Sequence, residues 1–481
     1  MIKFNRETLR DKIYACWMGK NIGGTMGTPF EGKRQINDIQ GFTTPEGTVL
    51  PNDDLDLQLV WLKAIEDRGP YNLNSQILGE YWINFIPPHW NEYGIGKGNM
   101  RAGLLPPLSG DYQNDWKNSN GAWIRSEIWA CLAPGCPDIA IKYAIEDACV
   151  DHGMGEGTYA EMFTAAVESA AFVVDDIREL INIGLSKIPA ECRIARSINL
   201  LTDAYDKGVD WKTARNMLVE DSQDLGWFQA PANVAFTMLG MLYGEGDFKK
   251  SMIYAINCGD DTDCTGATLG ALFGIMHGSK IIPEDWRSHI GDQIVTVAID
   301  RGSYHGFPRT CTELTERVLS MIPVMLKANN ANIVIYDGED CFDEVCIDSF
   351  KQSLVGEKLC TRSGKSYSID FIYARAMVEF TDDPVIEPLG ELNIKITFFN
   401  QMPDSKHINL RWLLPDGWSV EGRKDVFLNG GSPDNRPDGT VKTITVNITA
   451  GETVQPVNRI ILEASSAGRP SVGLIPITIL G

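Results

Sequence analysis

The sequence predicts a helical domain followed by an all-β sandwich, and three observations support this fold class. Apolar residues recur at helical spacing through the first two-thirds of the chain. From about Asn329 onward, short β-rich runs alternate with turn residues. The chain has 481 residues, which is more than one compact core usually holds, so we expect two or three domains.

The helical prediction covers residues 1–328. Leu55, Leu59 and Leu62 fall at positions i, i+4 and i+7, which is one face of a helix. The apolar-and-small stretch from Gly266 to Met276 is shorter than a membrane span and indicates a buried helix. Similar patterns predict helices over residues 158–185, 195–205 and 233–243.

The β prediction has two parts, a β-rich connecting segment at 329–384 and an immunoglobulin-like β-sandwich at 385–481. Short strands at this spacing are typical of a sandwich. The expected strands are 333–336, 368–373, 392–399, 408–414, 443–448, 459–463 and 472–479. The run Leu413 to Trp418, followed by Val420, resembles a turn of immunoglobulin-like modules attached to bacterial glycoside hydrolases. A structural cap and a ligand-binding module are both compatible with this segment.

Bulk composition excludes several classes of protein. Hydrophobic residues make up 43% and charged residues 22%, which is typical of a globular protein. A net charge of −21 disfavours nucleic acid and membrane partners. Eleven cysteines without a C-x-x-C pair, and an N-terminus without a leader pattern, predict reduced thiols and a cytoplasmic location. The composition makes no prediction of oligomeric state.

The region between Ile86 and Asn120 is rich in proline, glycine and aromatic residues. A loop this long is usually functional, so we expect it to form one wall of a cleft. Its aromatic residues are candidates for stacking a base, although packing beneath the loop is the commoner role of tryptophan. These aromatics are Trp90, Tyr93, Tyr112 and Trp116. Gly98, in a glycine-rich run that lacks the strand–loop–helix context of phosphate sites, is a substrate-binding candidate.

Two acidic clusters, Asn52-Asp53-Asp54 and Asp261-Thr262-Asp263, each precede a predicted helix. Such residues cap helices, and each acidic one stabilises the helix by about 0.3–1 kcal/mol. Each cluster nevertheless holds more carboxylates than a cap needs, and Asp56 and Asp260 add to them. Crowded oxygen ligands suit Mg²⁺, Ca²⁺ or Mn²⁺ rather than zinc. The spacing alone leaves cation binding and helix capping equally open.

Five segments in order give the chain a family resemblance over roughly residues 10–300. The segment from Ala255 to Asp263, running into a small-residue helix through Gly274, resembles the G-G-D-T-D-T signature of the ADP-ribosylglycohydrolase family. The other four are similar to further elements of that family's pattern. They are the glycine-rich turn Gly27-Thr28-Pro29-Phe30-Glu31-Gly32, Asn52-Asp53-Asp54, Asn120-Gly121-Ala122 with Arg125, and Asp151-His152.

The resemblance implies a helical domain that holds two Mg²⁺ ions, with Mn²⁺ as an alternative. The metal ligands that it implies are Asn52, Asp53, Asp54, Asp261 and Asp263. Cys264 stands where the family has Thr or Ser, and a thiol is a poor Mg²⁺ ligand. Either Thr265 replaces it as a ligand, or one metal site is weakened.

The resemblance also implies catalytic and substrate-binding residues. Glu31, Asp261 and Asp263 are the catalytic candidates. Asn120 and Gly121 are expected to offer backbone donors to the diphosphate or ribose. Arg125 is a candidate phosphate partner and His152 a candidate ligand contact; a structural role is equally compatible with each.

The implied function is hydrolysis of the N- or O-glycosidic bond of an ADP-ribosylated protein or small molecule, with release of ADP-ribose. Two alternatives stay open. The same dinuclear site can serve a hydrolase of another ribosyl or glycosyl metabolite. A non-catalytic ADP-ribose-binding protein is the other alternative, which the four aspartates disfavour.

Overall fold

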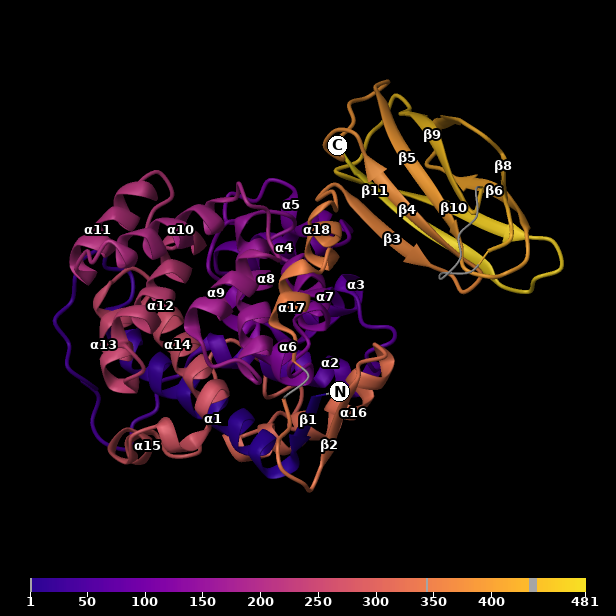
Figure 1. The fold of residues 1–481 in the computed structure, drawn as a ribbon. Helices are drawn as coiled ribbons and strands as arrows, with labels where there is room; N and C mark the ends of the chain where they lie inside the picture. Colours follow the sequence, from indigo (N-terminus) through magenta and orange to yellow (C-terminus); the bar gives the residue numbers. More distant parts are fainter. Residues whose placement is uncertain (1, 343–344, 432–438) are drawn as a thin grey trace. The chain divides into compact units, whose positions relative to one another are not determined.

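The computed structural model describes residues 2–342, 345–431 and 439–481, which form two compact units (Figure 1). Unit 1 comprises Met1–Lys97 and Asn114–Thr361. Unit 2 comprises Gly98–Gln113 and Arg362–Gly481.

Unit 1 is helical, as predicted, with one two-stranded parallel sheet between β1 (Ile2–Asn5) and β2 (Ile333–Tyr336). The predicted helical run 158–185 is divided into α8 and α9, because the side chain of Asp176 caps the N-terminus of α9. The helices are α1 (Arg6–Gly27), α2 (Asp53–Arg68), α3 (Ser75–Phe85), α4 (Asn91–Ala102, which continues into unit 2), α6 (Glu127–Leu132), α7 (Pro137–Ala148), α8 (Glu156–Ala171), α9 (Ile177–Leu185), α10 (Arg193–Asp206), α11 (Trp211–Asp221), α12 (Ala230–Gly244), α13 (Phe248–Asn257), α14 (Thr262–His277), α15 (Glu284–Ile290), α16 (Cys311–Ala328), α17 (Ile347–Gln352) and α18 (Val355–Cys360).

Helices α1 and α14 cross at very short range, and this contact positions one acidic cluster. A Cβ atom on Gly23 would lie 2.0 Å from the carbonyl oxygen of Gly266, so only glycine permits the approach. At the end of the same interface, the Thr262 hydroxyl donates to the carbonyl of Gly27 at 2.8 Å. The N-terminus of α14 is therefore fixed against the C-terminus of α1, close to the turn that carries Glu31.

Replacing Gly23 with alanine is expected to lower the free energy of unfolding by about 1–3 kcal/mol, because the added methyl group overpacks the α1–α14 contact. Urea denaturation of the full chain measures the change. Gly41→Ala is the matched control, since a Cβ at Gly41 meets nothing within 4 Å. Equal stabilities for the two variants would contradict the close crossing.

Unit 2 contains two antiparallel sheets, which confirms the C-terminal β prediction. One sheet has the order β3-β4-β5-β9-β7 and the other β11-β10-β6-β8, and side chains from both form one hydrophobic core. The resemblance to immunoglobulin-like modules stays a prediction. The elements are α5 (Leu108–Asp111), β3 (Ser366–Asp370), β4 (Ala374–Phe380), β5 (Glu391–Asn400), β6 (Lys406–Leu413), β7 (Ser419–Glu421), β8 (Asp425–Leu428), β9 (Val441–Thr449), β10 (Val457–Ser466) and β11 (Val472–Leu480).

Two features of the structure differ from the sequence predictions. The connecting segment 329–384 is split, because β2 pairs with β1 in unit 1 whereas β3 and β4 pair into the sheet of β5 in unit 2. The boundary expected at residue 385 therefore falls inside unit 2. The expected long loop 86–120 contains α4 and α5 instead. Two glycines within α4, Gly94 and Gly96, pack closely; a Cβ on Gly94 would lie 2.6 Å from the carbonyl oxygen of His89.

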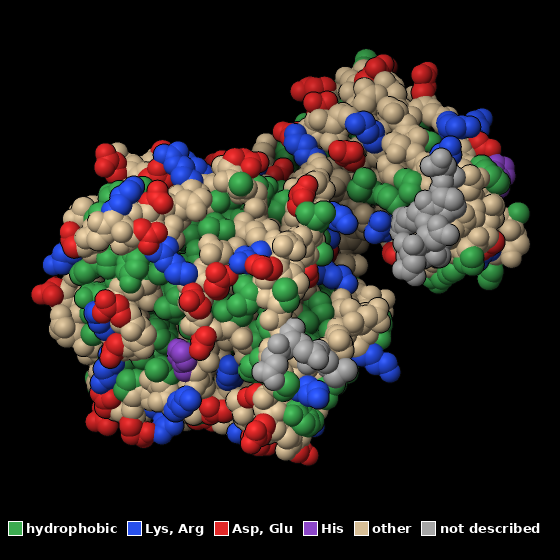
Figure 2. Space-filling model, in the orientation of Figure 1, with side chains coloured by type: hydrophobic (Ala, Val, Ile, Leu, Met, Phe, Trp, Pro, Cys, Tyr) green, Lys and Arg blue, Asp and Glu red, His purple; other side chains and the backbone are tan. Residues whose placement is uncertain are grey.

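Surface and global features add three findings. Acidic and basic side chains are interspersed on the face of unit 1 drawn in Figure 2. No helix among the described residues is both long enough and apolar enough to cross a membrane. No disulfide joins the cysteines of the described chain.

Candidate metal centre and active site

A cavity of about 350 Å³ lies in unit 1, where the N-terminal ends of α2 and α14 meet the turn after α1. Asp53 from one acidic cluster and Asp261 and Asp263 from the other line it together with Glu31. The lining residues are Thr28, Glu31, Pro51, Asp53, Trp90, Asn91, Glu92, Tyr93, Asn120, Gly121, Ile124, Trp227, Phe228, Asp261, Asp263, Cys264 and Val297.

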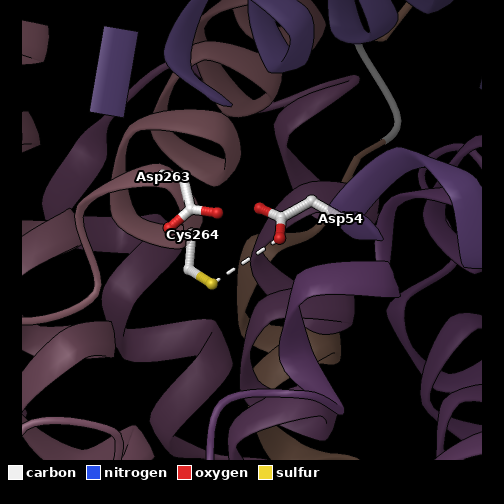
Figure 3. Close-up of side chains that lie close together, drawn as sticks. All are labelled: Asp54, Asp263 and Cys264. Atoms are coloured by element: carbon white, nitrogen blue, oxygen red, sulfur yellow. Dashed lines mark hydrogen bonds between the residues drawn. The ribbon is translucent and has the colours of Figure 1, made fainter. Parts of the chain in front are cut away.

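Two overlapping groups of side chains in this centre are close enough to share a cation. One ligand atom each from Glu31, Asp261 and Asp263 lies within 4.8 Å of the others, and the same holds for Asp54, Asp263 and Cys264. Figure 3 shows the second group, in which the three side chains point toward one another. The Cys264 thiol donates to Oδ1 of Asp54 at 3.6 Å. Asp263 belongs to both groups, so the two positions adjoin.

The donor set fits a hard divalent cation. Oδ2 of Asp54 and Oδ1 of both Asp261 and Asp263 are buried without a hydrogen-bond partner among the described residues. Burial, reinforced by the neighbouring carboxylates, raises the pKa of Asp54 and of Asp261 well above the ordinary range. Buried carboxylates in this state need either protons or a cation. Carboxylate oxygens are the ligands preferred by Mg²⁺ and Mn²⁺.

In the presence of a chelator, the free energy of unfolding is expected to fall as the pH rises from about 5 to about 8. Partial burial and the charges of Asp263 and Asp53 raise the pKa of Glu31 to about 8, and burial with Asp263 raises that of Asp53 to about 6. The folded protein therefore holds more protons than the unfolded chain in this window, and stability decreases with pH. Chemical denaturation at several pH values, with and without saturating Mg²⁺, measures the effect. Mg²⁺ should offset the loss; a flat profile under chelation would be inconsistent with the crowded carboxylates.

The turn that carries Glu31 is held by backbone bonds to the loop before α14. The Gly32 amide donates to the carbonyl of Asp260 at 2.9 Å, and the Asp260 amide donates to the carbonyl of Lys33 at 3.0 Å. The carboxylate of Asp260 pairs with Arg34 at 3.1 Å. Asp260 therefore fixes the two loops together and does not add to the acidic cluster, contrary to the sequence-based expectation.

Two polar side chains orient the aspartates of the cavity. The Tyr93 hydroxyl donates to Oδ2 of Asp53 at 2.9 Å. The side-chain amide of Asn120 donates to Oδ2 of Asp261 at 2.6 Å. Asn120 was predicted to contact substrate through its backbone; its side chain positions a carboxylate.

Several predicted site residues do not line the cavity. The Asn52 side chain caps α2 by accepting the Asp54 amide at 2.8 Å, and the Thr265 hydroxyl donates to the Thr262 carbonyl at 3.2 Å. Asp56 accepts the amides of residues 297 and 298 at 2.6 and 2.7 Å instead of joining the cluster. Gly98 lies in the segment of α4 assigned to unit 2 and is not a lining residue.

Arg125 and His152 belong to a buried polar network. This arrangement matches the structural role that the sequence left open for each residue, rather than contact with substrate. Arg125 is fully buried and contacts Asp147 at 2.7 Å and Asp151 at 2.6 Å. His152 lies 2.9 Å from Asp151 and 3.1 Å from the Ser119 hydroxyl. Arg125 also donates to the carbonyl of Gly121, a residue that does line the cavity. The network therefore contacts the cavity wall through Gly121 and does not itself line the cavity.

Glu92, Trp227 and Phe228 are among the lining residues that the sequence did not predict. Burial raises the pKa of Glu92 to about 7. A Cβ on Gly121 would lie 2.1 Å from Oε1 of Glu92, so glycine makes room for this carboxyl group. Trp227 and Phe228 lie just before α12. An aromatic pair before a helix does not by itself predict a cavity from the sequence.

Of the four aromatics predicted to form the cleft wall, Trp90 and Tyr93 line the cavity. Trp116 packs edge-on against Phe228, with ring centroids 5.9 Å apart. Tyr112 packs against the core of unit 2.

Comparison with known proteins gives a family match and two structural similarities. The model of the family described as ADP-ribosylglycohydrolase matches residues 5–317. A solved structure titled "ADP-ribosylglycohydrolase-related protein complex" is 18% identical, with a TM-score of 0.45, covering 67% of this chain and 99% of that one. A FixG-related protein from Vibrio parahaemolyticus is 12% identical, with a TM-score of 0.19, covering 23% of this chain and 97% of that one. No curated protein sequence matches this chain.

The family match includes every acidic residue of the cavity. It begins at the cap of α1 and ends within α16, so it extends over most of unit 1 and more than half of the chain. The chain therefore belongs to the ADP-ribosylglycohydrolase family.

Proposed function

We propose that this protein is a magnesium-dependent hydrolase that cleaves the N- or O-glycosidic bond of an ADP-ribosylated protein or small molecule and releases ADP-ribose. One observation carries the proposal. Carboxylates from three separate segments converge on one cavity, and several of their buried oxygens have no partner among the described residues. Family membership supplies the reaction type.

Asp53, Asp54, Asp261 and Asp263 are the residues that would hold Mg²⁺, with Mn²⁺ as the alternative. When bound, a divalent cation supplies positive charge that polarises and orients the hydroxyl groups of the sugar. The protein keeps the ligands in place through Tyr93 on Asp53 and Asn120 on Asp261. Losing such orienting partners typically weakens metal affinity or activity about 10- to 100-fold.

Glu31 is our candidate for proton transfer at the scissile bond. Glu31 is an exposed residue that lines the cavity, and an oxygen of its carboxyl group lies within 4.8 Å of ligand atoms of Asp261 and Asp263. Glycosidic cleavage passes through an oxocarbenium-like transition state and needs a carboxyl group that gives or takes a proton. A pKa near 8 lets Glu31 hold a proton at neutral pH in the metal-free protein. Asp261 and Asp263 are the other two catalytic candidates.

Glu31→Gln is expected to lower kcat by about 10²- to 10⁴-fold, because the amide cannot transfer the proton. Folding should be unchanged, since the side chain is exposed. Steady-state kinetics across pH measure the loss. Glu46→Gln is the matched control, because Glu46 is exposed and is not a lining residue. Wild-type kcat in the Glu31 variant would reject its role.

A second candidate, hydrolysis of another ribosyl or glycosyl metabolite, is favoured by a specific observation. None of the described residues that line the cavity is Lys, Arg or His. A diphosphate is usually bound by cationic side chains or by backbone amides. The aromatic side chains Trp90, Trp227 and Phe228 offer faces on which an uncharged base or sugar can stack.

A substrate panel tests the proposal and separates the two candidates. Arginine- and serine-linked ADP-ribosyl substrates are compared with ribosides that lack the diphosphate, each with Mg²⁺ and with chelator. Metal-dependent release of ADP-ribose supports the first candidate. Turnover of the diphosphate-free ribosides alone supports the second, and turnover that is unaffected by chelation would contradict both.

A further inference from the structure

The mixed group of Asp54, Asp263 and Cys264 differs chemically from the all-oxygen group of Glu31, Asp261 and Asp263. We infer that the mixed group binds a borderline or soft divalent cation, of the zinc or cobalt class, through the sulfur of Cys264. This inference rests on the proposed metal centre and assigns a different metal to one end of it.

The geometry of the mixed group is that of a built site. Asp54 is fully buried, Asp263 is 6% exposed, and each keeps one carboxylate oxygen without a partner among the described residues. The Cys264 sulfur lies 3.6 Å from Oδ1 of Asp54, and all three ligand atoms fall within 4.8 Å of one another. Figure 3 shows the sulfur and both carboxylates directed toward the same space.

Ligand softness decides which cation this arrangement favours. A thiol binds Mg²⁺ poorly, whereas thiolate sulfur combined with oxygen suits Zn²⁺ and neighbouring transition metals. On coordination the thiol proton passes to the buffer and a sulfur lone pair forms the metal bond, so no oxidant or reductant is needed. The other group has only hard carboxylate oxygens, which suit Mg²⁺.

Neither threonine hydroxyl beside Cys264 in the first turn of α14 restores an all-oxygen set at this end. Thr265 follows Cys264 on α14, but its hydroxyl donates to the Thr262 carbonyl at 3.2 Å and is not part of the cavity lining. The Thr262 hydroxyl donates to Gly27. Cys264 is therefore the α14 side chain that completes the group with the two aspartates.

Cobalt(II) chloride titrated into the chelator-treated, desalted full chain tests the inference, because a Co²⁺–thiolate bond produces a sulfur-to-metal charge-transfer band in the near ultraviolet. The wild type is expected to show the band, and Cys264→Ser is expected to lack it while still binding cobalt. Cys258→Ser is the matched control and should keep the band. Cys258 is also buried near the acidic loop, but its thiol donates to the Tyr254 carbonyl at 3.3 Å.

Competition between Zn²⁺ and Mg²⁺ for the site gives a second measurement. Cys264→Ser should lower Zn²⁺ affinity by at least about 10-fold and leave Mg²⁺ affinity equal or higher, because serine is a hard donor. Cobalt that binds the wild type without the band would overturn the inference and leave the metal centre standing. No binding of either cobalt or magnesium would overturn both. A wild-type spectrum without the band overturns the inference even if the serine variant fails to fold.

Discussion

Replacing Asp261 and Asp263 together with alanine is expected to abolish metal-dependent hydrolysis. Both side chains are buried, and Asp263 belongs to both groups of the centre. Losing them removes two of the four aspartate carboxylates proposed to hold the cation. Metal ions contribute several kcal/mol to transition-state stabilisation, so kcat/KM should fall by at least about 10³-fold.

A matched control and a stability measurement separate this effect from misfolding. Asp260→Asn changes the neighbouring position, whose positive φ of 61° asparagine tolerates. The Asp260 carboxylate pairs with Arg34, so this variant should stay within a few-fold of wild-type activity. Without metal, the double variant should be more stable at pH 8 than the wild type, because two mutually repelling buried carboxylates are gone. Activity retained by the double variant after chelation would contradict the proposed metal centre.

Arg125→Met is expected to lower the free energy of unfolding by about 3–5 kcal/mol, because it leaves Asp147 and Asp151 buried without their cation. The guanidinium group also lies over the Trp82 ring, 4.9 Å from its centroid. Arg6→Met is the matched control. Arg6 forms an exposed ion pair with Asp337, and such pairs contribute about 0–1 kcal/mol.

Urea denaturation of the two variants measures the difference. A phosphate-binding role for Arg125 predicts the opposite pattern. In that case Arg125→Met would fold with wild-type stability and show only a raised KM. That result would show that the buried ion pairs do not stabilise unit 1.

Much of the helical unit was predictable because its signals are local. The acidic clusters sit at the beginnings of helices, where their spacing is legible in the sequence, and the close contact of α1 with α14 follows from glycines that recur every four residues. Helix α4 was missed because glycine has low helix propensity. Gly94 and Gly96 of this helix instead allow close contact with other segments. A Cβ on Gly96 would lie 3.0 Å from the Cα atom of Asp151.

The direction of a polar side chain was the least predictable feature of the site. Asp56 accepts hydrogen bonds from backbone amides 241 and 242 positions away, and Asp260 forms an ion pair with Arg34. Both aspartates nevertheless lie beside cluster residues in the sequence. Arg125 finds its partners on or just after α7. Such choices depend on burial and on which distant groups fold nearby, which the spacing of residues does not encode.

Calorimetric titration of Mg²⁺ into the chelator-treated protein tests the central claim most directly. The converging carboxylates predict saturable binding in the wild type that is lost in the Asp261→Ala, Asp263→Ala double variant and retained in Asp260→Asn. Absence of saturable binding in the folded wild type, or equal binding in the double variant, would contradict the assignment of this cavity as a metal centre.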